Sequence, residues 1–265
     1  MKISIITPCY NAAETIEDTL KSIIHQTYTD YEVIIVDGGS TDSTVQLAEK
    51  YQELVKGKIT LVSEPDDGIF DAMNKGIKMV SGDIISLLNA DDEYASDDIL
   101  KIINDSFEQN SVDGVYGDLV YVNRKNTNKV IRYWKAGVFK RRKLYFGWTA
   151  PHLSLFVKKD VYEKYGYFDK SFKIAADYDI MLRFIAVHRI RLFYISKVLV
   201  KMKIGGVSNH GIKNLIRKSR EDIRALRKNH FGSCFVVIFK IMRKIKQFYP
   251  QSISILNNYV QDNNE

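Results

Sequence analysis

An acidic group follows an apolar run in the first half of this 265-residue chain. Residues 84–88 predict a buried strand, and Asn89, Asp91, Asp92 and Glu93 come directly after it. Carboxylates at the end of a buried strand are costly unless a positive charge meets them. Because Mg²⁺ and Mn²⁺ take oxygen ligands and commonly bind substrate phosphates, we expect Asp91 to hold such a metal and the metal to hold a nucleotide diphosphate. The alternative is a solvated turn or the first turn of a helix.

Polar clusters also follow the three strands expected before this one. Apolar residues at helical spacing predict a helix between successive strands, the last over about residues 69–80. This alternation predicts a mostly parallel sheet covered by helices on both faces. Ligands bind at the carboxyl ends of such strands, so the four clusters together predict one binding site. The other strands are expected at residues 3–7, 32–36 and 59–63, and their polar clusters at residues 7–11, 37–42 and 64–67.

Side chains that can cap a helix lie near two expected helix starts. Asn11 followed by Glu14 resembles a capping box for the first helix. Asp177 precedes a helix that we expect to begin at Tyr178, where a carboxylate can cap free backbone N–H groups. A structural cap is therefore one interpretation of Asp177, and a catalytic carboxylate is the other.

The pattern changes after residue 97. Apolar spacing predicts one more helix, and residues 115–123 and 129–134 predict a hairpin joined by the polar turn 124–128. Residues 136–151 are irregular, basic and aromatic. This segment is interpreted either as a mobile loop near the site or as a solvated basic loop.

The positive charge of the chain is concentrated at its C-terminal end. Residues 201–265 hold 13 Lys and Arg against 4 Asp and Glu, which gives +9, and the other 200 residues hold 26 against 28, which gives −2. Apolar residues recur at helical spacing among the cations of residues 212–246. Such basic amphipathic helices bind anionic membrane surfaces. The alternative is that they pack on the catalytic domain with their charges in water.

Several classes of protein and site are disfavoured. Two distant cysteines make no disulfide framework, which favours a reducing, cytoplasmic compartment. The N-terminus has no signal-peptide pattern, and no apolar run approaches the roughly 20 residues of a membrane helix. Few His and no clustered Cys give a zinc site no support. Without G-x-G-x-x-G or a Walker motif, dehydrogenase and kinase functions are disfavoured.

Six short segments resemble the family-2 glycosyltransferases of GT-A fold, in order and in spacing, over about residues 1–205. The resemblance implies a Rossmann-like, mostly parallel sheet flanked by helices. It implies a catalytic domain at 1–205, with a nucleotide-binding half (1–95) and an acceptor-binding half (96–205), followed by a basic amphipathic helical tail at 206–265. The segments are ISIITPCYNAAETI, VIIVDGGSTDST, GIFDAMNKGI, GDIISLLNADD, PHLSLF and FKIAADYDIMLR.

The variants in these segments look most like bacterial enzymes that build capsule, exopolysaccharide or O-antigen units on lipid-linked acceptors. The resemblance implies inverting transfer of a sugar from a nucleoside-diphosphate donor, UDP-sugar being favoured, to an acceptor hydroxyl. It implies Mn²⁺ or Mg²⁺ as cofactor and, with the basic tail, the inner face of the cell membrane as location. No nucleic acid is expected as partner, because the positive charge is confined to the tail rather than spread over the domain.

Residue roles follow from matching positions. Asp91 would ligate the metal as the last Asp of D-x-D, Asp92 would face the ribose or the donor sugar, and Asp177 would be the general base. Asp37 would accept a hydrogen bond from the base of the nucleotide. His152 would lie near the diphosphate. The nucleoside pocket would use Thr7, Pro8, Tyr10 and Asn11, and the ribose and phosphate region Asn74, Lys75 and Gly76.

Three positions depart from the family pattern. Asn89 stands where many relatives have the first Asp of D-x-D, so a neutral amide would offer its carbonyl oxygen to the metal or bind it through water. Met73 stands where many have Arg, which removes an expected contact to the base. Ala176 replaces a common Glu before the expected base.

Three alternatives stay open. Asp179 competes with Asp177 as the base, unless it pairs with Arg183 one helical turn on. A nucleotidyltransferase would also present a nucleotide and a metal at strand ends. A sugar-nucleotide-binding subunit without turnover is the non-catalytic alternative.

Overall fold

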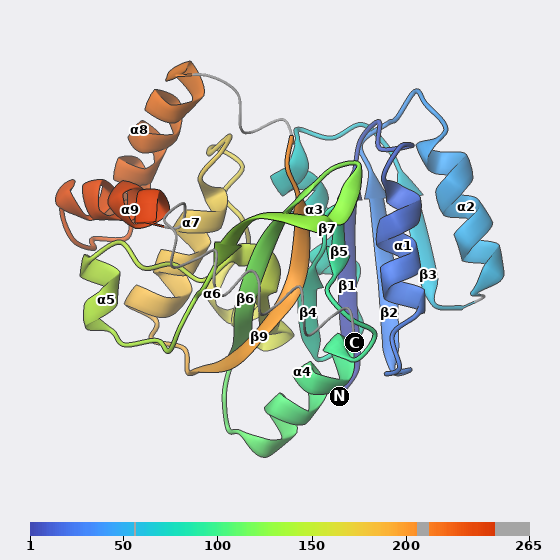
Figure 1. Cartoon of the computed structure of the whole chain (residues 1–265), viewed down its shortest axis with the longest axis horizontal. Coiled ribbons are helices and arrows are strands. Elements are labelled where there is room, and N and C mark those ends of the chain that lie inside the picture. Colours follow the sequence, from blue (N-terminus) through green and yellow to red (C-terminus); the bar gives the residue numbers. More distant parts are fainter. Residues whose placement is uncertain (56, 206–211, 247–265) are drawn as a thin grey trace.

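The computed structural model describes residues 1–55, 57–205 and 212–246. Nine strands form one sheet in the order β3-β2-β1-β4-β8-β6-β9-β5, with β7 paired to β6 beside this path (Figure 1). The expected tail at 206–265 therefore lies partly outside the described residues.

The first half of the chain alternates strands and helices as the pattern predicts. The strands β1 to β4 are mutually parallel, in the order β3-β2-β1-β4, so their carboxyl ends lie at one edge of the sheet. Their β-branched runs are buried. The elements are β1 (Ile3–Cys9), α1 (Ile16–Ile24), β2 (Tyr31–Asp37), α2 (Thr44–Leu54), β3 (Ile59–Ser63), α3 (Ile69–Met79) and β4 (Ile84–Leu87).

The second half makes the sheet mixed rather than mostly parallel. The strand β8 runs antiparallel to β4 and β6, and β5 runs antiparallel to β9, while β6 and β9 are parallel. The predicted hairpin is present as β6 and β7, with a shorter turn than expected. The elements are β5 (Asp92–Tyr94), α4 (Ile99–Gln109), β6 (Gly114–Asn123), β7 (Asn126–Trp134), α5 (Arg142–Tyr145), a 3₁₀ turn (His152–Ser154), β8 (Leu155–Lys158), α6 (Lys159–Tyr165), α7 (Ala176–Met181), a π-helical turn (Leu182–Val187) and β9 (Leu192–Lys203).

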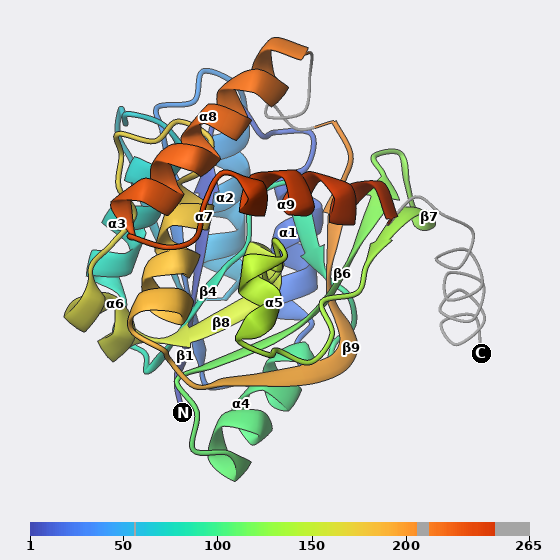
Figure 2. The same ribbon diagram turned by 90° about the vertical axis from the view of Figure 1, so that its left-hand side faces the viewer.

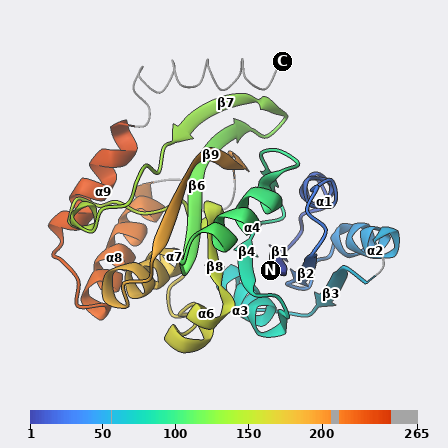
Figure 3. The same ribbon diagram turned by 90° about the horizontal axis from the view of Figure 1, so that it is seen from below.

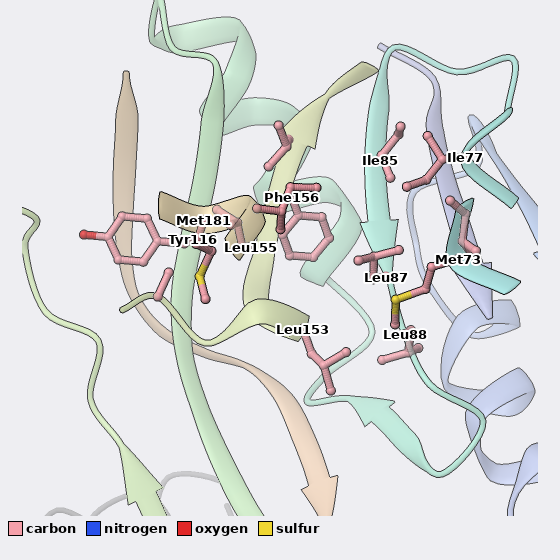
Figure 4. Close-up of a cluster of buried hydrophobic side chains, with 14 of the residues drawn as sticks. Met73, Ile77, Ile85, Leu87, Leu88, Tyr116, Leu153, Leu155, Phe156 and Met181 are labelled. Atoms are coloured by element: carbon pink, nitrogen blue, oxygen red, sulfur yellow. The ribbon is translucent and has the colours of Figure 1, made fainter. Parts of the chain in front are cut away.

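Helices cover both faces of the sheet. Figure 3 shows α3 and α6 on one face and α1 and α4 on the other. Met73 and Ile77 of α3 pack towards Ile85 and Leu87 of β4, and Phe156 of β8 continues this core (Figure 4). The core therefore runs without a break from the first half of the chain into the second.

The tail forms two helices, α8 (Ile212–Lys228) and α9 (Phe235–Lys246), that pack beside α7 and α5 (Figure 2). Ala225 and Leu226 of α8 and Val236 and Val237 of α9 are buried in the same core as the sheet. Within the described residues, no helix is long and apolar enough to cross a membrane.

The expected capping box at Asn11 is wrong. The helix α1 begins at Ile16 without a side-chain cap. Asn11 instead lies in a turn with a φ of 48°, and its Oδ1 accepts a hydrogen bond from the Thr41 N–H at 2.9 Å. The reason is tertiary, because the loop after β2 brings the competing donor.

Candidate active site

The loops after β1 and β2 are joined by hydrogen bonds. The Asn11 N–H donates to Ser40 Oγ at 2.7 Å, and the Ala13 N–H donates to Asp42 Oδ2 at 3.1 Å. Thr7 and Pro8 are buried in β1, and Tyr10 is 63% exposed at its end. The structure therefore gathers the predicted nucleoside-pocket residues at one edge, with the Tyr10 ring free to meet a ligand.

Asp37 is buried at the end of β2, and its carboxylate organises the loop that follows. It accepts hydrogen bonds from the Ser40 N–H at 2.9 Å, from the Ser40 hydroxyl and from Ser63 Oγ at 2.7 Å. Burial acts to raise the pKa of this carboxyl, but these hydrogen bonds hold it below its ordinary value. Its observed partners belong to the protein, and contact with a base stays a prediction.

The acidic group after β4 begins in a turn at Ala90 and Asp91, but this turn leads into β5 rather than a helix, and it is not fully solvated. Asp92 begins β5 and is fully buried, with its Oδ2 accepting from Asn89 Nδ2 at 3.0 Å and its Oδ1 from the Lys203 N–H at 3.2 Å. Burial and the neighbouring Asp91 charge raise its pKa well above the ordinary value. Asp92 is occupied inside the protein, so it does not face a ribose or a sugar in this conformation.

Asn89 and Asp91 offer oxygens that no other side chain among the described residues is shown to contact. Asn89 Oδ1 is buried and accepts no hydrogen bond among the described residues. Arg124 and Lys203 act on Asp91 only at longer range, because their ion pairs are with Glu14, Asp18 and Glu93. Burial raises the pKa of the Asp91 carboxyl, which a bound cation would reverse.

The two side chains offer oxygens of the type that a hard divalent cation binds. Such ions take carboxylate and amide oxygens and keep positions for phosphates and water. The described residues contain no group of three or more His, Cys, Asp or Glu that is placed to bind a metal. Asp91 and Asn89 would therefore hold only part of the coordination shell, and a bound ligand and water would supply the rest.

Two residues predicted near the ribose and phosphates have partners within the fold. The Asn74 amide donates to the Phe168 carbonyl at 2.8 Å and accepts from the Phe168 N–H at 2.9 Å, which ties α3 to the loop before α7. Lys75 Nζ lies 2.8 Å from Glu64 Oε1 and 3.8 Å from Asp71 Oδ2. The Asn74 side chain thus joins two parts of the fold, and Lys75 pairs with the loop after β3. Contact of either residue with a ribose or a phosphate stays a prediction.

The structure brings together two predicted residues that are 25 positions apart in sequence. His152, in the 3₁₀ turn before β8, has its Nδ1 3.7 Å from Oδ2 of Asp177, in the first turn of α7. Both side chains are partly exposed, at 29% and 22%. The helix α7 begins at Ala176 rather than at Tyr178, and no side chain caps it, so the helix-cap interpretation of Asp177 is wrong. Asp177 Oδ1 instead accepts from the N–H of the next residue, Tyr178, at 2.8 Å.

Asp177 stays ionised at neutral pH. Burial acts to raise its pKa, but the charges of His152, Lys218 and Lys240 outweigh burial and keep the pKa below its ordinary value. Burial lowers the pKa of His152 below 6.5, so the imidazole is neutral near pH 7. The lowered pKa of Asp177 and the lowered pKa of His152 are consistent with each other. At the acidic pH where Asp177 titrates, His152 is protonated, so its positive charge can lower the pKa of Asp177. The pair is a carboxylate beside a neutral imidazole.

Asp179 does not compete for the role of base, because it is fully buried and structural. Its carboxylate lies 3.3 Å from Arg183 Nη2 and 3.0 Å from Lys228 Nζ, and it accepts from Asn229 Nδ2 at 2.8 Å. The expected pairing with Arg183 is confirmed, and two further partners come from α8 and the residue after it.

Tyr121 of β6 connects the two parts of the site. Burial raises the pKa of its phenol, Arg132 and Lys218 oppose this, and the charges of Asp92 and Asp177 add to it. One side chain therefore feels both the acidic group after β4 and the expected base. The acidic group after β4 offers the oxygen ligands that a metal-bound anion needs, and a carboxylate such as Asp177 can accept the proton of a hydroxyl.

Residues of the tail contribute to this site, and no local pattern in the sequence indicates them. Glu221 of α8 accepts hydrogen bonds from the N–H groups of Lys173 at 3.1 Å, Ile174 at 2.8 Å and Ala175 at 3.0 Å. This carboxylate fixes the segment that leads into α7. Lys218, also in α8, acts electrostatically on Asp177. Only folding reveals these roles, because they depend on contacts across more than 40 residues.

Comparison with known proteins identifies the family of this chain. The family described as glycosyl transferase family 2 matches residues 4–162. A PGL/p-HBAD biosynthesis glycosyltransferase of Mycobacterium bovis is 29% identical over 208 residues, which cover 78% of each chain. A chondroitin synthase of Pasteurella multocida is 28% identical over 86% of this chain, but this region is only 22% of that protein.

Solved structures show the same fold. Residues 1–349 of S. aureus TarS in complex with UDP-GlcNAc match with a TM-score of 0.65 and 20% identity, over 86% of this chain and 65% of that one. This chain spans 41% of the longer TarS structure. The mannosyltransferase PcManGT of Pyrobaculum calidifontis, in complex with GDP-Man and Mn²⁺, matches with a TM-score of 0.63 and 21% identity, over 91% and 73% of the two chains.

The fold, with its strand-end site, is therefore the GT-A fold of glycosyltransferases. The chain belongs to glycosyl transferase family 2 and is a glycosyltransferase. This sets aside the nucleotidyltransferase alternative.

Proposed function

We propose that this enzyme transfers a sugar, with inversion, from a nucleoside-diphosphate donor to a hydroxyl of a lipid-linked glycan acceptor in bacterial surface polysaccharide synthesis. UDP-sugar is the favoured donor, Mn²⁺ or Mg²⁺ is the cofactor, and the inner face of the cell membrane is the location. Similar proteins are named for glycan biosynthesis, and solved neighbours hold UDP-GlcNAc or GDP-Man.

One observation carries the proposal. Asn89 Oδ1 is buried in the acidic group after β4 and accepts no hydrogen bond among the described residues. The charges of Asp92, from this group, and of Asp177, which lies 3.7 Å from His152, both act on the Tyr121 phenol. A transferase needs both parts, because one must hold the leaving diphosphate and the other must activate the acceptor. The acidic group alone would support binding without turnover.

The chain's own residues would act at three points. Asp91 and Asn89 would hold the divalent cation, which supplies positive charge to the diphosphate leaving group. Asp177 would accept the proton of the acceptor hydroxyl, a contribution of typically ~10²–10⁴-fold in rate. His152, whose imidazole is neutral, lies 3.7 Å from Asp177 and would donate a hydrogen bond to it or contact the sugar nucleotide. Glu221 would hold the segment that positions Asp177.

The first experiment is calorimetry with UDP, GDP, ADP, CMP and NAD, with and without Mn²⁺, on the wild type and Asp91→Ala. One nucleoside diphosphate is expected to bind, with an affinity that Mn²⁺ improves in the wild type and not in the variant. Binding of no nucleotide, or an effect of Mn²⁺ that survives Asp91→Ala, would contradict the donor site.

A second experiment separates catalysis from binding alone. With the nucleotide identified, the matching nucleotide-sugar is incubated with the enzyme and a lipid-linked glycan. Release of the nucleoside diphosphate that needs Asp177 supports transfer. Donor binding with no release, unchanged in Asp177→Asn, would support a non-catalytic binding subunit.

A further inference from the structure

The outer side of α9 carries large apolar side chains with no partner covering them among the described residues. Its inner side, with Val236, Val237 and Lys240, is buried against the protein. An apolar row of this kind on a surface helix marks an interaction site when it is continuous with other apolar surface. The exposed residues and their exposed fractions are Phe235 (64%), Ile238 (51%), Phe239 (37%), Ile241 (36%) and Met242 (49%).

The segment around α5 extends this row. The Phe146 ring lies 5.4 Å from the Phe239 ring and is 54% exposed, and Tyr145 is 49% exposed. Gly147 packs directly against the Lys240 backbone, and a Cβ at this position would collide with it. Figure 2 shows α5 and α9 side by side. We call the outer side of α9 together with Val138, Tyr145 and Phe146 the α5–α9 face.

The charge around this face has one sign. Residues 119–159 contain 11 Lys and Arg and no Asp or Glu, and residues 223–261 contain 7 and none. Burial, and then the charges of Arg243, Lys140 and Arg142, lower the pKa of Lys143, so four cations gather here. Within the described residues, none of the four has an acidic partner in an ion pair. Cations without an acidic partner in the protein are available to an external anionic surface.

We propose that the α5–α9 face docks the enzyme on an anionic lipid bilayer, with its apolar side chains at the acyl boundary and its cations at the headgroups. The match is one of charge and polarity, since this combination is what an interfacial helix presents to such a bilayer. The inference deepens the proposed function, because it names the surface that would meet a lipid-linked acceptor. The proposed docking surface is not confined to the tail, because Val138, Tyr145 and Phe146 belong to the catalytic domain. Of the two tail helices, only α9 takes part, since α8 packs against the protein.

The face is joined to the expected base. Lys240 pairs with Asp222 at 2.8 Å, and its ammonium lies 3.4 Å from the centre of the Tyr178 ring, next to Asp177. The helix that carries the base and the helix that would lie on the bilayer are therefore fixed to each other. Docking would bring the acceptor side of the site towards the lipid.

The test is co-sedimentation of the full chain with vesicles of phosphatidylcholine, with and without about one third phosphatidylglycerol. Binding is expected only with the anionic lipid and is expected to weaken at high salt. Lys140→Glu/Arg142→Glu is expected to weaken it at least about 25-fold, since each cation contributes about fivefold. Ile238→Asp/Met242→Asp is expected to weaken it more than about tenfold.

Matched controls are Leu54→Asp on α2, where Leu54 is 64% exposed, and Lys21→Glu/Lys78→Glu, which reverses two other exposed cations. Neither is expected to change vesicle binding. Binding to neither vesicle, equal binding to both, or equal loss in the controls would overturn the inference. So would light scattering that shows a dimer dissociated by Ile238→Asp/Met242→Asp, because the face would then join two copies.

The outcome is separable from that of the proposed function. Calorimetry of nucleotide binding without vesicles does not involve this face, and Ile238→Asp/Met242→Asp is expected to leave it unchanged. If nucleotide and Mn²⁺ bind as proposed while vesicles do not, only the docking inference fails. If vesicles bind and no nucleotide does, only the donor site fails.

Discussion

At the scale of single residues, the two carboxylates that we propose for chemistry differ in their surroundings from two that hold the fold. Asp91 and Asp177 are partly exposed and lack complete sets of protein partners, whereas Asp92 and Asp179 are fully buried and hydrogen-bonded. Burial and partner number therefore distinguish neighbouring Asp residues that the sequence presents as equivalent.

We expect Asp177→Asn to lower kcat by about 10²–10⁴-fold and to leave nucleotide affinity unchanged, because the base acts on the acceptor. Steady-state rates and calorimetry measure the two effects. Asp160→Asn, an exposed Asp at the start of α6, is the control and should retain full activity. Activity of Asp177→Asn within twofold of wild type would contradict the assignment.

The pKa directions predict the pH dependence of the reaction. The pKa of Asp177 in the folded protein lies below 3.8. Above pH 3.8 the side chain is therefore ionised and contributes its full stabilisation. This stabilisation is lost as the pH falls through the folded-state pKa. The pKa of His152 lies below 6.5. We therefore expect kcat/KM to show no ionisation of Asp177 between about pH 6 and 8. An acid limb near neutral pH that disappears in Asp177→Asn would argue against this.

Asn89 has a reason to be an amide. Its Nδ2 donates to the buried Asp92, so Asn89→Asp would place two carboxylates together and cost about 1–3 kcal/mol of folding free energy without metal. A cation would then bind more strongly, and Mn²⁺ is expected to raise the melting temperature more in the variant than in wild type. Thermal unfolding with and without Mn²⁺ tests this, and equal responses would contradict it.

At the scale of elements, α7 depends on α8 for its position. Glu221 accepts three successive backbone N–H groups just before α7. Glu221→Ala leaves them without an acceptor, so we expect kcat to fall about tenfold while nucleotide affinity is kept. Glu221→Gln, which keeps a carbonyl oxygen, should recover much of the rate.

The control for this prediction is Glu53→Ala, an exposed Glu on α2. A purely structural role for Glu221 would lower stability and leave the kcat of the folded fraction unchanged. Measuring kcat together with the unfolding midpoint separates these outcomes.

At the scale of the whole molecule, the tail and the catalytic domain share one core. The buried Lys240–Asp222 pair joins α9 to α8. Lys240→Met would leave a buried, unpaired Asp222 and cost about 3–5 kcal/mol, whereas Lys240→Met/Asp222→Leu should cost much less. Urea unfolding followed by circular dichroism and by fluorescence of the buried Trp148 should show one shared transition. A separate early transition of the tail would contradict this.

The alternation of strands and helices and the four polar strand ends were predictable from sequence, because buried strands and amphipathic helices leave strong local patterns. Apart from a metal at Asp91, the residue roles came only from the resemblance of six short segments to a family. Residues 59–63 match β3, and Asp91 and Asp177 fall where the motifs place them. The metal, the base and the donor remain proposals that these residues support.

Tertiary structure decided what depends on distant contacts. It turned Asp92 and Asn74 inward, gave Asn11 a partner after β2 instead of a capping role, and added Glu221 to the segment before Asp177. It also divided the basic tail into a packed helix, α8, and a helix with an open apolar side, α9. The physical reason is that a side chain's hydrogen-bond partners and solvent exposure depend on which elements pack together, and local sequence patterns do not carry that information.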